Sequence, residues 1–250
     1  ALNCAKPDSG KGIVAARQRV RFGPFYGWMD FGDLFWQPGC SSLHYDWLYI
    51  MMIDYVRSGE RAFLDRAAEM AQHRVDVDQI WSDREHPAFR GLTRYEKGFS
   101  NIHGGAKGGY YKPIASHNWI RGVVWWHYLT GDMAARECAV RNASVGVKLR
   151  VVDRLEQTPN KPPQPRSSGW TIGVLCDAYD LTGKQKYLDW AKMIWEAHLK
   201  KLWKDKGPTF GTRRGNSLQF YYPANALVLL HQRSGDRELL DYMRAVCTHM

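Results

Sequence analysis

The feature that most constrains the fold of this chain is a short break that recurs between pairs of helix-like segments. The breaks are Ser58-Gly59, Thr130-Gly131, Thr182-Gly183 and Ser234-Gly235. The last three glycines are evenly spaced, with a period of roughly fifty residues, which is typical of repeated helical units. The first interval is longer because an insertion rich in Gly, His and Arg occupies residues 82–116. The chain is therefore predicted to consist of stacked helix hairpins.

Each repeat pairs two different kinds of helix. Residues 47–56 and 120–129, ahead of the first two breaks, are apolar nearly all round, which predicts helices buried on every side. After each break, apolar residues recur every three or four positions, which predicts a helix with one buried face. After Gly183 these residues are Tyr187, Leu188, Ala191, Ile194, Trp195, Leu199 and Leu202, and after Gly235 they are Leu239, Leu240, Met243, Val246 and Cys247.

The residues at the breaks suit the end of one helix and the start of the next. Glycine is the residue best suited to the left-handed position that closes a helix. Acidic residues favour a helix N-terminus, and Glu60, Asp132 and Asp236 follow three of the four breaks, whereas Lys184 follows the third. The breaks thus predict an inner, buried helix followed directly by an outer, amphipathic one.

The predicted fold class is all-α, with the hairpins arranged as an α/α toroid. Single hairpins cannot bury their own apolar faces, so they must stack side by side, either as an open solenoid or as a ring. Buried inner helices and long loops favour the ring. About four hairpins are present, so we expect an incomplete barrel of the (α/α)6 type within a single domain over residues 1–250. We expect residues 1–43 to form an N-terminal loop segment and the chain to be a piece of a larger, multi-domain protein.

Charge and hydropathy restrict the classes of partner. The chain carries 35 Lys and Arg against 25 Asp and Glu, a formal net charge of +10, which attracts anionic partners or simply gives a solvated basic surface. No nucleic-acid-binding motif accompanies this charge, so nucleic acid is not expected as a partner. No apolar run reaches the roughly 18 residues that span a bilayer, so a membrane is not expected either.

The five cysteines do not form a metal-binding pattern. They contain no C-x-x-C pair, which argues against a zinc site. Cys138, Cys176 and Cys247 lie in helical patterns, where cysteine usually behaves as a small core residue. Cys4 and Cys40 lie in loop-like sequence and are able to pair with each other.

Polar and aromatic residues concentrate just ahead of the predicted inner helices. If the inner helices run parallel, their N-termini meet on one face, and these residues become neighbours in space. They are His44, Tyr45 and Asp46; Ser116, His117, Asn118 and Trp119; Arg166, Ser168 and Trp170; and Asn216, Gln219, Tyr221 and Tyr222. The segment 26–33, with Trp28, Asp30 and Asp33, and the insertion 82–116 are expected to reach the same face.

Aromatic rings beside polar groups are the usual means of holding a sugar. Trp28, Tyr45, Trp119, Trp170 and Tyr222 are the rings expected in a cleft, although most aromatic residues of a domain belong to its core. With His44, Asp46, Asn118, Arg166, Asp30 and Asp33, they make up the expected substrate-binding set. The basic charge predicts that the sugar is acidic.

Such a cleft would permit β-elimination of a uronate polymer. That reaction needs a group that neutralises the carboxylate, a base that removes the α-proton and an acid for the leaving oxygen. The sequence offers Arg94 and Asn118 for the first role, His117 or His103 for the second, and Tyr95 or Tyr45 for the third. His117 is equally well placed to serve only as a helix cap.

Two other functions remain open. Hydrolysis by two carboxylates would use Asp30, Asp33 or Asp46, although Asp in Gly-containing segments also stabilises turns. The same three carboxylates are the candidates for binding Ca²⁺, a possible cofactor for which no EF-hand spacing is present. A glycan-binding module without catalytic activity is the third reading.

Several motifs resemble one family of carbohydrate-active proteins. The runs Y-G-W-M-D-F-G-D at 26–33, H-Y-D-W at 44–47, H-G-G at 103–105, S-H-N-W at 116–119 and L-T-G-D at 129–132 look like the C-terminal α/α toroid domain of the exo-rhamnogalacturonan lyase-like proteins. The resemblance covers roughly residues 20–250. It implies a pectin-type uronate substrate, secretion or a periplasmic location, and β-sandwich domains of the same parent protein as partners.

The motifs are also similar, more loosely, to those of other toroid lyases. These lyases use an Asn, His, Tyr and Arg set, which corresponds here to Asn118, His117, Tyr95 and Arg94. Toroid lyases often build their cleft between domains, so the resemblance also implies that the β-sandwich domains contribute to activity.

Overall fold

The fold is helical, in agreement with the predicted all-α class. The computed structural model describes residues 34–36, 39–41, 46–82, 89–93, 115–157, 163–211 and 218–249. Two three-residue strands, β1 (Leu34–Trp36) and β2 (Gly39–Ser41), form an antiparallel hairpin ahead of the helices. The rest of the described chain is helices, turns and short connections.

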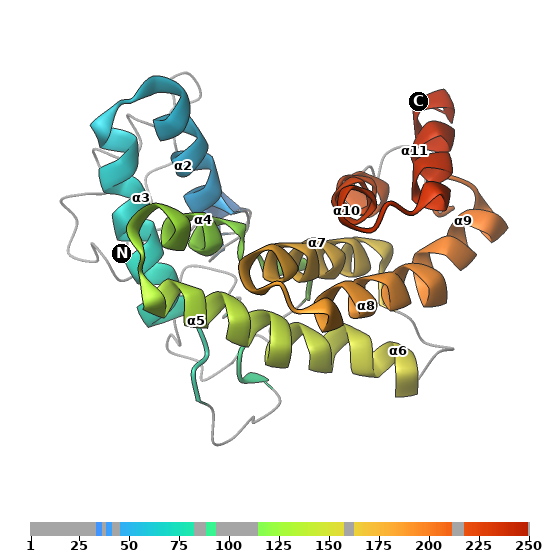
Figure 1. Cartoon of the computed structure of the whole chain (residues 1–250), viewed down its shortest axis with the longest axis horizontal. Helices are drawn as coiled ribbons and strands as arrows, with labels where there is room; N and C mark the ends of the chain where they lie inside the picture. The colour runs from blue at the N-terminus through green and yellow to red at the C-terminus, as the bar shows by residue number, and fades with distance from the viewer. Residues whose placement is uncertain are drawn as a thin grey trace.

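Four inner helices succeed one another along the chain and in space. They are α2 (Trp47–Ser58), α4 (Arg121–Thr130), α7 (Pro165–Thr182) and α10 (Leu218–Ser234). Each packs on the next, α2 on α4, α4 on α7, and α7 on α10. Hairpins that are neighbours in sequence are therefore neighbours in the fold (Figure 1).

An outer helix follows each inner one, as the breaks predict. The four outer helices begin with α3 (Arg61–His73), α5 (Met133–Arg141), α8 (Gln185–Ile194) and α11 (Arg237–His249). The first three continue into π-helical segments, η1 (Arg74–Asp78), η4 (Asn142–Val152) and η5 (Trp195–Leu199). After η4 and η5 the chain returns to α-helix in α6 (Asp153–Gln157) and α9 (Lys200–Lys206). The π-helical turns were not predicted.

The glycines of all four breaks have the left-handed backbone conformation expected of a helix end. Gly59, Gly131, Gly183 and Gly235 have φ between 65° and 76°. At the second break, the Asp132 carboxylate accepts hydrogen bonds from the backbone N–H groups of Ala134 and Ala135, at 2.8 and 3.1 Å. The predicted positions of these helix ends are confirmed.

The apolar faces of the helices form one continuous core. Tyr187, Ile194 and Trp195 of the third outer helix are fully buried, in agreement with their spacing. Cys138 and Cys176 are also fully buried, as predicted. Cys247 is exposed near the end of α11, so its assignment to the core was wrong: it lies beside the buried Val246 but outside the apolar stripe.

The expectation that the inner helices are buried on every side was also wrong. Val56 of α2 and Tyr128 and Leu129 of α4 are 65%, 56% and 48% exposed. These residues lie near the C-terminal ends of their helices. Apolar residues on every side of a helix therefore do not show that every side is buried.

The expectation that the inner helices run parallel was wrong for α7 and α10, which cross. In Figure 1, α7 lies across the view whereas α10 is seen nearly end-on. The close approach at this crossing requires glycine, because a Cβ on Gly169 of α7 would lie 2.5 Å from Cα of Pro223 of α10. The crossing brings the first turns of α7 and α10 together, so that the residues predicted to meet at the N-terminal ends of these helices do so.

Candidate functional site

A cavity of about 210 Å³ lies where the inner helices meet. Ligand pockets for drug-sized molecules are typically about 300–1,000 Å³, so this cavity suits a ligand about as large as one sugar ring. Its lining comes from all four inner helices and from the segment ahead of α4. The lining residues are Asp46, Tyr49, Ile50, Trp119, Arg121, Gly169, Trp170, Gly173, Val174, Asp177, Tyr222, Asn225, Ala226 and Leu229.

One wall of the cavity consists of three aromatic rings in contact, and we call it the aromatic wall: Trp119, Trp170 and Tyr222. The ring centres of Trp119 and Trp170 are 4.4 Å apart, and those of Trp170 and Tyr222 are 4.5 Å apart. Trp119 is buried, whereas Trp170 and Tyr222 are half-buried and keep part of their surface accessible. A continuous apolar surface with accessible rings is suited to contact with the C–H face of a sugar.

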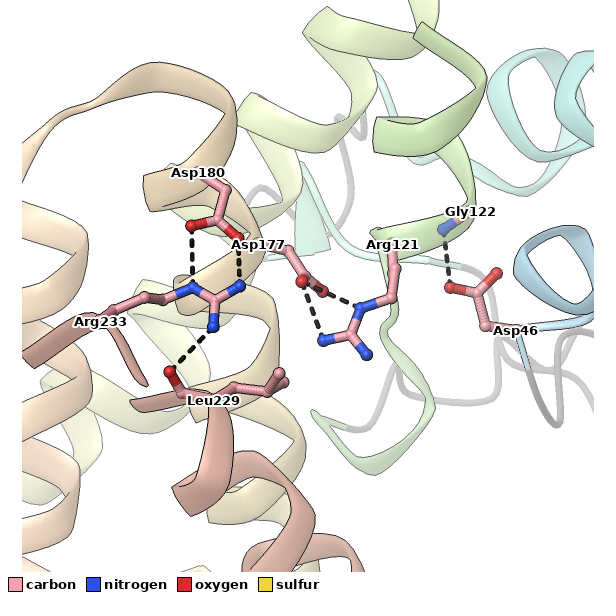
Figure 2. Close-up of polar contacts among 7 residues, drawn as sticks. All are labelled: Asp46, Arg121, Gly122, Asp177, Asp180, Leu229 and Arg233. Carbon is pink, nitrogen blue, oxygen red and sulfur yellow. Dashed lines mark hydrogen bonds and ion pairs between the residues drawn. The ribbon is translucent and has the colours of Figure 1, made fainter. Parts of the chain in front are cut away.

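The polar side of the cavity is an ion pair between two inner helices. Arg121, the first residue of α4, donates hydrogen bonds from Nε and Nη2 to Oδ1 of Asp177 of α7, at 3.0 and 2.9 Å. Figure 2 shows both bonds reaching the same oxygen. Among the described residues, neither Nη1 of Arg121 nor Oδ2 of Asp177 has a hydrogen-bond partner. The pair therefore retains a donor and an acceptor for a ligand.

The Arg121 guanidinium is positioned by an aromatic ring as well as by Asp177. Its central carbon lies 5.3 Å from the centre of the Tyr49 ring, a cation–π distance. Tyr49 in turn packs edge-on against Trp125, with ring centres 5.2 Å apart. This stacking holds the planar group in one orientation, which favours recognition of a carboxylate.

Burial raises the pKa of Asp177 to about 6, and the positive charges of Arg121 and Arg233 oppose the rise. Asp177 lies inside α7 and is only 8% exposed, so its charged form loses most of its hydration. A carboxyl group that exchanges its proton near pH 6 is able to act as an acid or to accept a proton in the working range of most enzymes.

Asp46 is a second carboxylate in the cavity, with a different environment. It caps the N-terminus of α2, where its Oδ1 accepts a hydrogen bond from the backbone N–H of Tyr49 at 3.2 Å. Its Oδ2 accepts one from the backbone N–H of Gly122 at 2.9 Å, which joins α2 to α4 (Figure 2). Burial raises the pKa of Asp46, against these two hydrogen bonds, which lower it. Both carboxylate oxygens of Asp46 thus accept hydrogen bonds from backbone N–H groups.

The structure brings together four residues of the predicted substrate-binding set. Asp46, Trp119, Trp170 and Tyr222 all line the cavity. Arg166 lies beside them, with its guanidinium carbon 5.5 Å from the centre of the Tyr222 ring. These residues come from four separate regions of the sequence.

His117 and Asn118 lie behind the aromatic wall and do not line the cavity. The His117 ring is 4% exposed and its centre is 5.8 Å from that of Trp119. Asn118 is fully buried, and its Oδ1 accepts hydrogen bonds from the backbone N–H of Thr93 at 2.8 Å and from Nδ2 of Asn142 at 3.2 Å. In the described structure Asn118 thus anchors the segment that carries Trp119.

The hydrogen bonds of Asn118 belong to a larger buried hydrogen-bond network. Arg74 of η1 donates from Nη2 to the Thr93 hydroxyl at 2.7 Å and from Nη1 to Oε1 of Gln79 at 2.8 Å. All of these side chains are at most 3% exposed. Because unpaired buried polar groups are costly, the network fixes Thr93 relative to η1 and to Asn118.

The remaining predicted site residues lie outside the described residues. They are the candidate catalytic residues Arg94, Tyr95 and His103 and the candidate binding residues Trp28, Asp30, Asp33, His44 and Tyr45. Among the described residues, no group of three or more His, Cys, Asp or Glu side chains is arranged to hold a metal ion.

Sequence reasoning missed Arg121, Asp177 and Tyr49. Arg121 directly follows the polar and aromatic residues 116–119, at the first position of a mainly apolar helix, and such an isolated charge was a signal that it has a specific partner. Asp177 was likewise the one acid in an apolar stretch of α7. Tyr49 had no such signal, since it lies among other large apolar residues.

The described helices include none long and apolar enough to cross a membrane. No protein-family model, curated protein or solved structure is significantly similar to this chain.

Proposed function

We propose that this is a carbohydrate-active domain whose cavity binds one uronate residue of an acidic, pectin-like glycan. The observation that carries the proposal is the pairing of the aromatic wall with the Arg121 guanidinium in one cavity. The wall offers a surface for a pyranose ring. Arg121 offers an unused nitrogen for the carboxylate, in a cavity of about the right size for one ring.

The reaction we propose is β-elimination. Arg121 would neutralise the uronate carboxylate, so that the proton on the adjacent ring carbon becomes acidic. A base removes that proton, the bond from the neighbouring carbon to the glycosidic oxygen breaks, and a double bond forms between the two carbons. The leaving oxygen takes a proton from an acid. Tyr49, Tyr222 and Asp177 line the cavity, and we propose them for these proton transfers.

Product absorbance tests this reaction. Elimination leaves a double bond conjugated with the carboxylate, which absorbs in the ultraviolet, and we expect such a product from pectic uronate polymers. The matched pair of variants is Arg121→Gln, expected to abolish the signal, and the distant Arg244→Gln, expected to retain it, since Arg244 is exposed on α11. No ultraviolet-absorbing product from any pectic or algal uronate would remove the lyase proposal.

Hydrolysis is the second candidate, and one observation favours it. Two carboxyl side chains, Asp46 and Asp177, line the same cavity, and burial raises the pKa of both. A carboxyl group with a raised pKa is what a glycosidase uses as its general acid. Hydrolysis gives reducing ends without ultraviolet absorbance, so the two reactions are separated by measuring both signals in one assay. Binding without either signal would indicate a glycan-binding module.

The proposal also includes the arrangement of the hairpins and the neighbouring domains. The stacked hairpins are proposed to belong to an α/α toroid, and the site to be completed by β-sandwich domains of the same parent protein. A secreted or periplasmic protein of the exo-rhamnogalacturonan lyase-like kind accounts for both features. The basic surface supports it, since a net charge of +10 attracts an anionic polymer.

A further inference from the structure

The described lining of the cavity carries more negative than positive charge. Its charged side chains are one cation, Arg121, and two acids, Asp46 and Asp177. The other polar lining residues, Tyr49, Tyr222 and Asn225, are neutral. A ligand carboxylate that enters would therefore be the third anionic group facing a single guanidinium in a small cavity. Like charges so close together cannot all remain ionised without a large cost.

The hydrogen bonds indicate which of the two acids can take up a proton. Both oxygens of Asp46 already accept backbone N–H groups, and such bonds favour the ionised form. Asp177 uses only Oδ1, which accepts both bonds from Arg121. Its Oδ2 has no hydrogen-bond partner among the described residues. A proton on Oδ2 would leave the Arg121 bonds in place and would give the cavity a new donor.

The charges around Asp177 support the same assignment. The titratable groups that act on Asp177 come from three neighbouring elements. They are Arg121 and Tyr128 of α4, Arg233 of α10, and Asp46 ahead of α2. Arg233 is engaged by Asp180 on α7 itself, through Nε to Oδ1 at 2.8 Å and through Nη2 to Oδ2. Arg121 is thus the one cation in direct contact with Asp177 among the described residues, and it is the cation that a ligand carboxylate would share.

We propose that a carboxylated sugar binds Arg121 together with one proton, which is taken up at Oδ2 of Asp177. This inference rests on the proposed function, since it concerns the same ligand and cavity. It makes Asp177 the residue that couples binding to pH. The protonated oxygen donates a hydrogen bond to the bound carboxylate, so the ligand and Asp177 share one proton and one guanidinium. A neutral sugar brings no charge and requires no proton.

The test is the pH dependence of affinity, measured from pH 5 to pH 8 by the fluorescence of the tryptophans with D-galacturonate as the probe. Proton uptake means that affinity falls with rising pH, by close to tenfold per pH unit above the pKa of Asp177. We expect this slope for the wild-type protein and for Asp189→Asn, which removes an exposed carboxylate of α8 that does not line the cavity. We expect affinity nearly independent of pH for Asp177→Asn with galacturonate, and for the wild-type protein with D-galactose.

The outcomes separate this inference from the proposed function. Galacturonate affinity that is equal at all pH values, or a slope that persists in Asp177→Asn, would overturn the proton coupling and leave the binding site intact. Absence of galacturonate binding at every pH would overturn the proposed function itself. Far-ultraviolet circular dichroism of each variant shows that it is folded. If Asp177→Asn fails to fold, direct counting of protons taken up by the wild-type protein, by calorimetry in buffers of different ionisation enthalpy, decides the question.

Discussion

Arg121 and Asp177 join two inner helices through one carboxylate oxygen, which accepts bonds from two nitrogens of the guanidinium at 3.0 and 2.9 Å. Similar polar links connect the other neighbouring inner helices. Asp46, ahead of α2, accepts a bond from the backbone of α4, and Asp180 of α7 pairs with Arg233 of α10 (Figure 2). The row of inner helices is therefore held by a polar contact at every step, and two of these contacts, those of Asp46 and Asp177, involve residues that line the cavity.

Asp177 should make the protein less sensitive to acid. Its folded-state pKa of about 6 lies above the ordinary value of 3.8, so between these values the folded state binds more protons than the unfolded state. The stability that it contributes is present at low pH and is lost as pH rises through 6, by about 3 kcal/mol in total. In Asp177→Asn, the free energy of unfolding should therefore fall more steeply on acidification from pH 7 to pH 4. Urea denaturation at several pH values in this range measures the free energy of unfolding of both proteins.

The matched control for this experiment is Val174→Ala, which removes apolar contacts from the same helix and no titratable group. It should lower the free energy of unfolding by a similar amount at every pH. If the two variants show the same pH dependence, the raised pKa of Asp177 is contradicted.

His198 should have the opposite effect in an overlapping pH range. Burial lowers the pKa of this side chain to about 4 from 6.5, and its Nδ1 lies 2.8 Å from the Ser168 hydroxyl. The unfolded state takes up a proton first, so stability is lost as pH falls from 6.5 through 4, by up to about 3 kcal/mol. His198→Gln, which retains a polar group, should lose less stability on acidification than the wild type. Ser168→Ala retains the histidine and should keep the wild-type pH dependence, and equal slopes for all three proteins would refute the assignment.

Gly169 should be intolerant of any side chain, whereas Gly173 on the same helix should tolerate alanine. A Cβ at Gly169 would lie 2.5 and 2.6 Å from the Cα and N of Pro223, backbone atoms that cannot move independently of α10. At Gly173 the nearest atom is 4.0 Å away. We expect Gly169→Ala to lower the melting temperature, at a cost of roughly 1–3 kcal/mol from overpacking. Gly173→Ala should be neutral or stabilising by up to about 1 kcal/mol. Equal melting temperatures would contradict the close crossing of α7 and α10.

Tyr222 and Tyr221 provide a matched pair for the aromatic wall. They are adjacent on α10, but Tyr222 lines the cavity and contacts Trp170, whereas Tyr221 is 63% exposed outside it. Tyr222→Ala should weaken galacturonate binding about tenfold, since a ring–sugar contact of about 1–1.5 kcal/mol is lost. Tyr221→Ala should bind as the wild type does. Equal affinities for the two variants, measured by fluorescence titration, would place the sugar elsewhere.

Much of the fold followed from local patterns. Glycine at Gly131 and an acid at Asp132 predict a helix end and a helix start from backbone conformation and capping alone, and both lie where predicted. The buried stripe from Tyr187 to Trp195 followed equally from its spacing. By contrast, the exposed Val56 and Tyr128 depend on which helices cover α2 and α4, which no local pattern contains.

Some residues of the candidate site were likewise predictable from the sequence, and others were not. Trp119, Trp170 and Tyr222 were predictable because each lies at the start of an inner helix, and stacked hairpins bring such positions together. Asp177 lies three turns inside α7, and only the packing of α7 against α4 brings it to Arg121. Asn118 shows the reverse case: its position in the sequence suggested a ligand contact, but partners from two other segments enclose it.

The most direct test of the account is a crystal structure of the protein soaked with D-galacturonate. We expect the sugar ring against Trp170 and Tyr222, with a carboxylate oxygen about 2.7–2.9 Å from Nη1 of Arg121. A sugar bound at another surface, with the cavity occupied by solvent alone, would contradict the assignment of this cavity as the binding site.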